Sequence, residues 1–311
     1  MLDLLTTGYP SLDHIFHVTH SPSVGETSRL LKIPSRYTFG GCGANIAVGL
    51  VKLGFRSGVA MVLGDDRSGE TYFEYLKASG VDTRDILICP NSATSESYLY
   101  INPDGEYQNF FYAGAADLWR GDLDLRSLSN SKCALLTAGS WVYNQQFLGL
   151  VRQSDRPMIW QLKPDVYAYP PDALADLTKS SHILIMNHIE ADYLTSTLRI
   201  NSCAELLSDE TELVVVTMGI EGSRIYIDQS VYDIPVVHPN RNIDTTGAGD
   251  GFTSGFLAGW LQDRTPLVCG QIGAVVASFV LEAVGCQTNL PNWETMKQRY
   301  EENFGELWLG H

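Results

Sequence analysis

A short glycine-rich segment, Asp244-Thr-Thr-Gly-Ala-Gly-Asp250, has the composition of an anion-binding site. The pattern that follows it predicts a helix over Gly249–Leu261, and the first N–H groups of a helix have no partner within that helix. They lie at the positive end of the helix dipole, which attracts anions. The N–H groups expected to face such an anion are those of Gly247, Ala248 and Gly249.

Asp250 stands directly beside this predicted anion site. A carboxylate there is useful to an enzyme that must remove a proton from a nucleophile attacking a phosphorus atom. The alternative is structural: Thr245 or Thr246 caps the helix, and Asp250 is favourable in its first turn. The glycines that expose the backbone next to the acid favour the catalytic interpretation.

Two familiar phosphate-binding motifs are absent from the sequence. No lysine follows a glycine, which excludes the Gly-x-x-x-x-Gly-Lys loop. Gly41-Cys-Gly43 and Gly247-Ala-Gly249 both lack the third glycine of the dinucleotide-binding fingerprint. Any nucleotide must therefore be bound by a different arrangement.

Polar residues and glycines also follow two predicted strands. Asn187 and Glu190 come after the apolar run 182–186 and begin a helical pattern, with a spacing that also fits an N-terminal capping box. Gly219 and Gly222 come after the buried run 213–217. Ligands bind at the carboxyl ends of strands in open α/β sheets, although a tight turn would use the same glycines.

A second glycine-rich segment, Gly40-Gly-Cys-Gly-Ala-Asn45, precedes a helix predicted over Ala44–Leu53. Gly41 allows a ligand to approach the backbone, and the Asn45 amide can both donate to and accept from hydroxyl groups. Asp13 follows the first predicted strand. An isolated aspartate such as Asp13 is more often a surface or capping residue than a ligand.

A regular alternation of strands and helices must position these residues. Three apolar runs are each followed by a helical pattern: 57–63 then 68–79, 134–137 then 144–152, and 182–186 then 189–198. This order predicts right-handed crossovers and a mostly parallel sheet with helices on both faces. Residues 223–236 alternate with a period near two, which predicts an antiparallel hairpin at the sheet edge.

Two aromatic, helix-poor segments interrupt this alternation, at approximately 14–37 and 94–112. We interpret them as a small β-lid inserted into a single domain of residues 1–311. An ordinary edge sheet would have the same composition, because aromatic residues are enriched in strands generally.

The overall composition excludes several classes of protein. The chain has 311 residues, of which 44% are hydrophobic and 18% charged, as in ordinary globular proteins. Its 21 Lys and Arg against 36 Asp and Glu give a net charge of −15, which argues against a polymeric nucleic acid partner. The six cysteines include no Cys-x-x-Cys pair, and no signal peptide or membrane-length apolar run is present. We therefore expect a cytoplasmic protein with reduced thiols and no membrane contact.

Taken together, the motifs resemble those of the ribokinase-like (PfkB) family of sugar and nucleoside kinases. DTTGAGDGF at 244–252 is similar to the family's second signature, and the segment 40–45 to its first. The segments 64–69, 187–190 and 216–222 follow in the family's order, so the resemblance spans nearly the whole chain. It implies a three-layer α/β/α ribokinase-like fold with a mostly parallel central sheet and a small β-lid.

The resemblance implies an ATP-dependent kinase that transfers the γ-phosphoryl group to an alcohol, with ATP and Mg²⁺ as cofactors. In the family's pattern Asp250 accepts the hydroxyl proton, while the N–H groups of 247–249 and Mg²⁺ stabilise the phosphoryl charge. Glu190, with Asn187, would order Mg²⁺ through water. The implied substrate-binding residues are Asp13, Gly41 and Asn45. The implied ATP-binding residues are Asn187, Thr217, Gly219, Gly222 and Thr245.

Many relatives also bind K⁺ beside the anion site. The matching positions here are Asp244, Thr246, Val280, Ala283, Gly285 and Asn289. Backbone carbonyls place no demand on side-chain type, so the sequence supports a K⁺ site only through Asp244. The same carboxylate could instead cap the loop or pair with Arg241.

One stretch departs from the family's pattern. Relatives often carry Asp-x-Asn-x-Arg after the central strand, whereas this chain has Gln161-Leu-Lys-Pro-Asp165. The acidic and arginine roles therefore cannot be transferred. Lys163 could supply a cation near the phosphates, but a solvated loop lysine is the simpler expectation.

The acceptor is left open between two substrate classes. A sugar is the main expectation, because sugar kinases are frequent in the family, and a nucleoside is the alternative. Residues 109–114 and 281–287 look more like those of bacterial adenosine kinases. A catalytically idle binding or regulatory relative is a third reading, against which the intact segment 247–250 argues. A homodimer that pairs through the lid is expected from some relatives.

Overall fold

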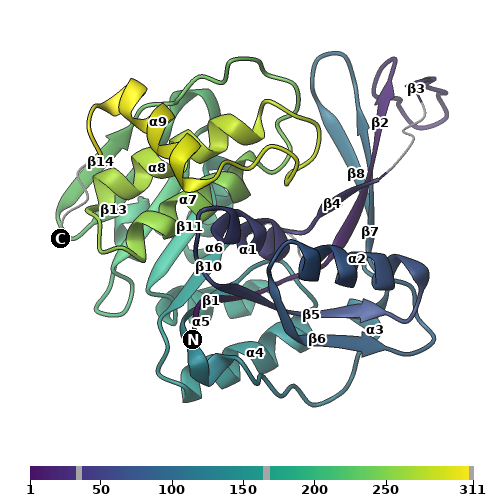
Figure 1. Ribbon diagram of the computed structural model, residues 1–311, viewed down its shortest axis with the longest axis horizontal. Coiled ribbons are helices and arrows are strands. Elements are labelled where there is room, and N and C mark those ends of the chain that lie inside the picture. Colours follow the sequence, from purple (N-terminus) through teal and green to yellow (C-terminus); the bar gives the residue numbers. More distant parts are fainter. Residues whose placement is uncertain (33–36, 164–168, 308–311) are drawn as a thin grey trace.

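The computed structural model describes residues 1–32, 37–163 and 169–307. Its main sheet has nine strands in the order β14-β13-β12-β11-β10-β9-β1-β5-β6 (Figure 1). All pairs from β12 to β6 are parallel, and β12-β13-β14 are antiparallel. The strands are β1 Leu2–Thr7, β5 Ser57–Gly64, β6 Asp82–Cys89, β9 Ser131–Leu136, β10 Met158–Gln161, β11 Ile183–Asn187, β12 Leu213–Thr217, β13 Ser223–Ile227 and β14 Ser230–Ile234.

Helices cover both faces of this sheet, because successive strand residues point to opposite sides. Leu4 of β1 belongs to the core beneath the helices α1, α7, α8 and α9, whereas Leu5 belongs to the core beneath α4, α5 and α6. The three-layer α/β/α prediction is therefore confirmed, as is the antiparallel edge hairpin. The helices are α1 Cys42–Lys52, α2 Arg67–Ala78, α3 Ala115–Leu118, α4 Trp141–Gln153, α5 Pro171–Lys179, α6 His188–Leu198, α7 Ala248–Trp260, α8 Pro266–Val280 and α9 Trp293–Phe304.

A second sheet of five strands projects from the main body, where β2, β7 and β8 extend together (Figure 1). Its strands are β2 Ser11–Val18, β3 Leu30–Lys32, β4 Thr38–Gly40, β7 Glu96–Ile101 and β8 Tyr107–Tyr112. We call it the lid sheet. It contains the two aromatic segments expected at 14–37 and 94–112, but it begins earlier, at Ser11, and also includes β4, which pairs with β2. Residues 33–36 lie outside the described part of the chain.

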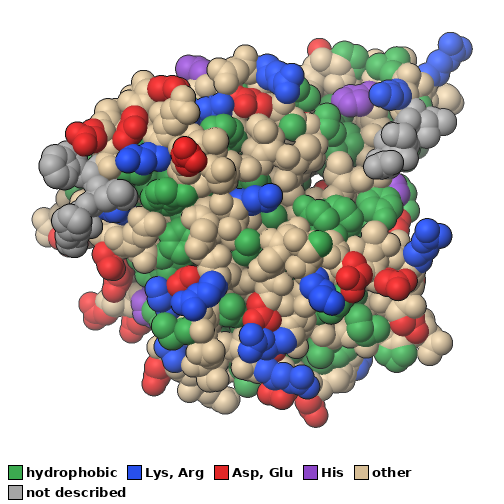
Figure 2. Space-filling view, in the orientation of Figure 1, with side chains coloured by type: hydrophobic (Ala, Val, Ile, Leu, Met, Phe, Trp, Pro, Cys, Tyr) green, Lys and Arg blue, Asp and Glu red, His purple; other side chains and the backbone are tan. Residues whose placement is uncertain are grey.

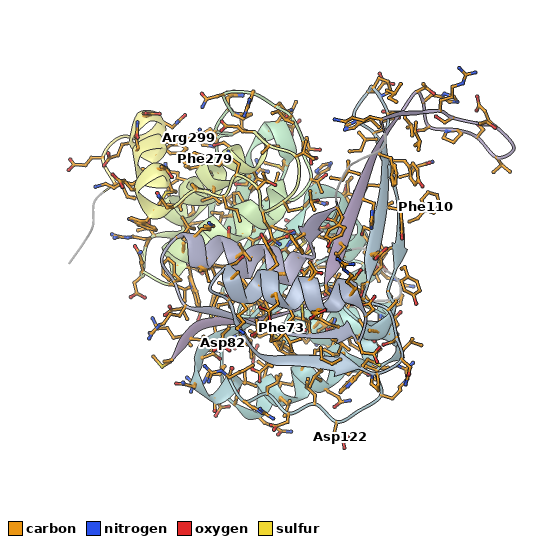
Figure 3. All side chains as sticks on the ribbon, turned by 45° about the vertical axis from the view of Figure 1, so that its right-hand side comes forward. Phe73, Asp82, Phe110, Asp122, Phe279 and Arg299 are labelled. Carbon is orange, nitrogen blue, oxygen red and sulfur yellow. The ribbon has the colours of Figure 1, made fainter. Side chains whose placement is uncertain are left out.

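The two faces of the lid sheet differ in composition. Asp13, Ser97 and Leu99 are buried on the face turned toward the main body. The other face carries stacked aromatic pairs, with ring centroids 4.9 Å apart for His14 and Tyr98. Phe110 is 62% exposed and points away from the main sheet (Figure 3). This alternation follows from the period of two along a strand.

Helix α7 packs closely against α8 through its glycines. A Cβ atom added to Gly255 would lie 2.7 Å from the backbone oxygen of Ile272, which is closer than real Cβ contacts allow. Glycines 251, 255 and 259, spaced four residues apart along α7, thus position the N-terminus of this helix by helix–helix packing. Within the described residues, none of the helices has the length and apolar character that a membrane span requires.

Candidate active site

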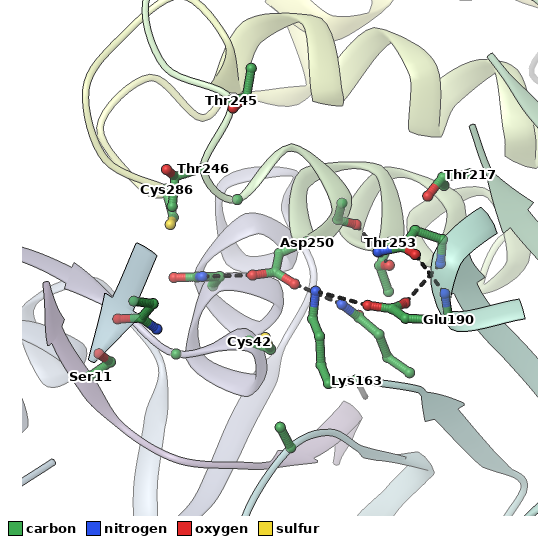
Figure 4. A pocket seen from close by; sticks show the side chains of 18 of the residues that line it. Ser11, Cys42, Lys163, Glu190, Thr217, Thr245, Thr246, Asp250, Thr253 and Cys286 are labelled. Atoms are coloured by element: carbon green, nitrogen blue, oxygen red, sulfur yellow. Dashed lines mark hydrogen bonds and ion pairs between the residues drawn. The ribbon is translucent and has the colours of Figure 1, made fainter. Parts of the chain in front are cut away.

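A cavity of about 560 Å³ is lined by residues of both sheets (Figure 4). The lid sheet contributes Asp13, Ser97, Leu99 and Phe111. The carboxyl ends of β10, β11 and β12 contribute Gln161, Lys163, Asn187, Glu190 and Thr217. The loop before α7 and its first turn contribute Thr245, Thr246, Gly247, Gly249 and Asp250.

The Asp250 carboxylate lies in the first turn of α7 and is 6% exposed. Asn45 Nδ2 donates to Oδ2 at 2.7 Å, and Gln161 Nε2 donates to Oδ1 at 2.7 Å (Figure 4). Each carboxylate oxygen therefore accepts one amide hydrogen bond and retains further lone-pair capacity. A carboxylate held in this way can accept a proton from a group in the cavity.

The backbone before Asp250 leaves N–H groups available to a ligand. Gly247 is the N-cap of α7 with φ of 80°, and a Cβ atom there would lie 2.6 Å from Cys286. Among the described residues, the N–H groups of Gly247 and Gly249 have no hydrogen-bond partner. Ala248 does not line the cavity, and its N–H lies 3.3 Å from the Thr245 oxygen. Two of the three expected donors thus remain at the positive helix end.

Asn187 and Glu190 form the capping box that their spacing allowed. Asn187 Oδ1 accepts from the Glu190 N–H at 2.8 Å, and Glu190 Oε2 accepts from the Asn187 N–H at 2.7 Å. The second carboxylate oxygen, Oε1, lies 3.6 Å from Lys163 Nζ. Burial raises the pKa of Glu190 above its ordinary value, against the opposing effect of the Lys163 ammonium group. Capping therefore uses only one of the two oxygens.

Lys163 corrects an expectation, because it is not a freely solvated loop lysine. Its side chain is 35% exposed, lines the cavity and forms an ion pair with Glu190 (Figure 4). Pro164 and Asp165, the rest of the divergent stretch, lie outside the described residues.

Asp13 is buried within β2 rather than being a surface acid. The Ser11 hydroxyl donates to its Oδ1, and Ser11 in turn lies 3.0 Å from the Ser97 hydroxyl. Burial raises the pKa of Asp13 to about 6, and the nearby Asp250 charge adds to this effect. A Cβ atom on Gly40 would overlap the Asp13 carboxylate, so the glycine of β4 makes room for it.

Gly41 is the N-cap of α1 and Asn45 lies in its first turn, and both residues line the cavity. Gly41 has φ of 94°, and a Cβ atom there would lie 2.3 Å from the Tyr9 oxygen. Asn45 lines the cavity, but both ends of its amide have protein partners, since Oδ1 accepts from Gln287 Nε2 at 2.7 Å. The expected substrate-binding group therefore also holds Asp250.

Of the expected ATP-binding residues, four line the cavity and one does not. Gly222 lies at the turn into β13 with φ of 88°, where a Cβ atom would lie 2.1 Å from the Ile234 oxygen. That contact explains the glycine structurally. The four that line the cavity are Asn187, Thr217, Gly219 and Thr245.

The expected K⁺ ligands are only partly brought together. Asp244 Oδ1 accepts from the Thr246 N–H and Oδ2 from the Gly285 N–H, both at 2.9 Å. Asp244 therefore joins the loop before α7 to the turn after α8, as the capping alternative required. Asn289 donates to the Phe279 oxygen at 2.9 Å. Val280 is buried at the end of α8, and its oxygen accepts from the Ala283 N–H at 3.4 Å.

Sequence reasoning missed two residues around Asp250. Gln161 ends β10 at the carboxyl edge of the sheet, so the rule applied to β11 and β12 would have found it. Gln287 has no local signal, because it approaches Asn45 only through the turn after α8.

A buried carboxylate at the N-terminus of a helix, beside free N–H groups at the carboxyl edge of an α/β/α sheet, fits an enzyme that transfers a phosphoryl group to an alcohol. Residues 19–293 match the model of the pfkB family of carbohydrate kinases, and the chain belongs to this family. The family resemblance in the sequence is confirmed.

Relatives cover nearly the whole chain. A nucleoside kinase of Methanocaldococcus jannaschii is 30% identical over 97% of this chain and 98% of its own. A nucleoside kinase of Methanothermobacter thermautotrophicus is 28% identical over 97% of both chains. The crystal structure of a Methanocaldococcus jannaschii nucleoside kinase superimposes with a TM-score of 0.84 at 27% identity, covering 97% of this chain and 99% of that one.

The comparisons favour the nucleoside alternative over the sugar that was the main expectation. A sugar kinase among the relatives, the 5-dehydro-2-deoxygluconokinase of Geobacillus kaustophilus, is 25% identical over 97% of this chain and 94% of its own. Family frequency was therefore a poorer guide than residues 109–114 and 281–287, which resemble adenosine kinases.

Proposed function

We propose that this protein is a nucleoside kinase that transfers the γ-phosphoryl group of ATP to a nucleoside hydroxyl. One observation carries the proposal: the carboxylates of Asp13 and Asp250 line the same cavity as the free N–H groups of Gly247 and Gly249. The two carboxylates can bind and deprotonate an alcohol acceptor, and the two N–H groups can bind a phosphoryl group. The nucleoside kinases among its relatives support the choice of acceptor.

The chemistry assigned to Asp250 is proton acceptance. The acceptor oxygen attacks the γ-phosphorus, the bond to the β,γ-bridging oxygen breaks, ADP leaves, and the hydroxyl proton moves to the carboxylate. The N–H groups of Gly247 and Gly249 stabilise the negative charge of the phosphoryl oxygens. These donors are fixed by the backbone, so they need no reorganisation during the reaction.

The lid side of the cavity suits the two halves of a nucleoside. The Asp13 carboxylate can accept charge-assisted hydrogen bonds from ribose hydroxyls. Phe111 and Tyr9 line the same cavity, with ring centroids 5.0 Å apart and planes at 63°. Such rings offer an apolar π-face to a nucleobase.

ATP and Mg²⁺ are assigned to the opposite side. Asn187, Thr217, Gly219 and Thr245 are the proposed ATP contacts. Glu190 fits an outer-sphere Mg²⁺ site, because its Oε1 is not used by the capping box and Mg²⁺ in proteins usually retains several waters. Asn187 and Glu190 would hold the ion through those waters, and the ion would add positive charge beside the ATP phosphates.

Two further proposals concern K⁺ and assembly. The Asp244 oxygens each accept one N–H group and retain lone pairs, so a monovalent cation near Asp244 and Gly285 stays a prediction. Pairing of two chains through the lid sheet is likewise a proposal, supported by exposed Phe110 and Tyr112 on β8. Sedimentation velocity of the wild type and of Phe110→Ser would test it, and a monomeric wild type would refute it.

A screen of acceptors tests the proposed function directly. ADP release should be measured with Mg-ATP and a matched panel of purine nucleosides, pyrimidine nucleosides, ribose and hexoses. We expect turnover with at least one nucleoside and a lower kcat/KM for every free sugar. A free sugar as the best acceptor would favour the sugar kinase, and no acceptor at all would favour the idle relative.

A further inference from the structure

Four hydrogen bonds link side chains in a buried line through the active site. Tyr75 of α2 donates its hydroxyl to Gln287 Oε1 at 2.8 Å, and Gln287 Nε2 donates to Asn45 Oδ1 at 2.7 Å. Asn45 Nδ2 then donates to Asp250 Oδ2 at 2.7 Å. Gln161 reaches the other carboxylate oxygen from β10 at 2.7 Å.

We propose that Gln161 and Gln287 are positioning residues that fix the orientation of the Asp250 carboxylate, Gln161 directly and Gln287 through Asn45. The inference rests on the proposed function, in which Asp250 is the proton acceptor. Neither glutamine belongs to the motifs that identified the family. Gln161 stands where relatives often carry an aspartate, which could not donate a hydrogen bond when ionised.

The direction of the hydrogen bonds carries the proposal. In each link the donor points toward Asp250, ending with two N–H groups on its two oxygens. An amide has a donor end and an acceptor end of nearly equal size, so Asn45 could rotate by 180° about its last bond. Rotation would put its Oδ1 against the carboxylate oxygen. Gln287 opposes this, because a rotated Asn45 would place its Nδ2 against the Gln287 Nε2, and Gln287 would then have to rotate as well.

Burial makes the loss of any of these hydrogen bonds costly. Asn45, Gln161 and Gln287 are 4%, 3% and 8% exposed, so bulk water has little access to replace a lost partner. Hydrogen bonds to a charged group are stronger than neutral ones in such surroundings. Gln161 and Asn45 together occupy one lone pair on each Asp250 oxygen, and Asp250 itself lines the cavity.

The decisive variant is Gln287→Glu, which keeps the size of the side chain and its acceptor for Tyr75. An ionised carboxylate cannot donate to Asn45 Oδ1, so the Asn45 amide loses the partner that sets its orientation. We expect kcat to fall by about tenfold or more, which corresponds to the loss of one hydrogen bond to a charged group, with the KM for ATP nearly unchanged.

A matched control exists elsewhere in the chain. Gln271 of α8 also accepts from a tyrosine hydroxyl, that of Tyr300 at 2.6 Å, and it does not line the cavity. Gln271→Glu should leave kcat unchanged. Gln161→Leu, which removes the other donor to Asp250, should lower kcat as Gln287→Glu does.

The pH dependence separates positioning from a general loss of packing. At low pH the carboxyl group introduced by Gln287→Glu is protonated, and it can donate to Asn45 again. The ratio of variant to wild-type kcat should therefore rise as pH falls. For Gln287→Leu the ratio should stay constant, because leucine cannot donate at any pH.

A kcat for Gln287→Glu equal to that of Gln271→Glu, or a ratio that does not change with pH, would overturn the proposal. Thermal unfolding tests the hydrogen bond between Gln287 and Asn45 without any measurement of enzyme activity. The stabilities of Asn45→Ala, Gln287→Leu and the double variant are compared with that of the wild type. We expect the two losses of stability to be non-additive, and strict additivity would contradict the link. An inactive wild type with non-additive losses would refute the proposed function while leaving the hydrogen-bonded line supported.

Discussion

Asp13 and Asp250 line one cavity, but their surroundings prepare them for different tasks. Asp250 accepts one hydrogen bond from each of two amides, and these bonds hold its carboxylate in one orientation. Asp13 is buried beside two serines, and its pKa is raised to about 6 by that burial. Differences of this kind allow two carboxylates to serve as proton acceptor and hydroxyl ligand side by side.

The raised pKa of Asp13 predicts a pH-dependent acceptor affinity. Below pH about 6 the carboxyl group gains a proton and loses its charge-assisted hydrogen bonds, so the acceptor KM should rise by up to about tenfold per pH unit. The KM for ATP should change much less. Steady-state kinetics between pH 5 and 8 would measure both. In Asp13→Asn the acceptor KM should be high at every pH, and an unchanged pH profile in that variant would remove Asp13 from acceptor binding.

The raised pKa of Asp13 has the opposite effect on stability: acceptor binding should improve as pH rises, whereas the free energy of unfolding should fall. Between the ordinary aspartate pKa of 3.8 and the raised pKa of about 6, the folded protein binds this proton more tightly than the unfolded chain does. The contribution of Asp13 to the free energy of unfolding is therefore largest at low pH and is lost as pH rises through this window.

Asp250→Asn should abolish most turnover while the fold remains intact. The substituted amide cannot accept the hydroxyl proton, so kcat should fall by about 10²- to 10⁴-fold. Binding of ATP, measured by calorimetry, should change little. Near-normal kcat in a variant with a wild-type circular dichroism spectrum would exclude Asp250 as the base.

At the scale of elements, the contact between α7 and α8 determines where the anion-binding loop lies. Gly251, Gly255 and Gly259 of α7 all lie where a Cβ atom would meet α8 within 3.0 Å. The helices approach closely only because these residues lack side chains. The N-terminus of α7 is thereby held against the carboxyl edge of the sheet.

Gly255→Ala should destabilise the protein by about 1–3 kcal/mol, because the added methyl group overlaps the Ile272 carbonyl and forces the helices apart. Gly149→Ala in α4 is the matched control, since a Cβ atom there meets nothing within 4 Å. That change should stabilise the protein by about 0.4–1 kcal/mol. Urea unfolding of both variants measures the difference, and equal effects would contradict close α7–α8 packing.

Asp244 connects the loop before α7 to the turn at Gly285, and a bound K⁺ would reinforce this connection. We therefore expect activity to rise with K⁺ and much less with Na⁺ or Li⁺ at matched ionic strength. Asp244→Asn should remove the difference among the three salts. Identical rates of the wild type in all three would show that the hydrogen bonds to Thr246 and Gly285 hold the loop without an ion.

At the scale of the whole molecule, the candidate active site lies where the two sheets meet. The main sheet and α7 supply the proposed phosphoryl-transfer side, and the lid sheet supplies Asp13, Ser97 and Phe111. The net charge of −15 is compatible with the proposed binding of ATP. On the face shown in Figure 2, acidic and basic side chains are interspersed, whereas the N–H groups of the cavity are a local feature of one helix end.

Because ligands would bridge the two sheets, nucleosides should stabilise the whole fold. A nucleoside at about 100 times its Kd should add about 2.7 kcal/mol to the free energy of unfolding. Differential scanning fluorimetry with the nucleoside, with free ribose and with neither would detect the corresponding rise in Tm. Asp13→Ala should remove most of the nucleoside effect, and an equal rise in that variant would place the ligand outside this cavity.

The amino-acid sequence by itself determined the local features of this protein. The alternation of buried strands with helices, the hairpin at 223–236 and the helix after Gly247 follow from periodicity and from the short-range preferences of glycine and polar residues. The capping box of Asn187 and Glu190 is also local, because its partners are three residues apart. Asp250 could be singled out for the same reason, since its anion site is formed by its own neighbours in the chain.

Only the tertiary structure decided which distant residues surround that carboxylate. Gln161, Asn45 and Gln287 come from separate segments, and their contacts depend on the order of strands and on the turn after α8. Whether Asp13 is exposed or buried, and whether Lys163 is solvated or paired, likewise depends on packing between elements far apart in the sequence. Periodicity specifies which face of an element is buried, but not which side chain from another element meets it there.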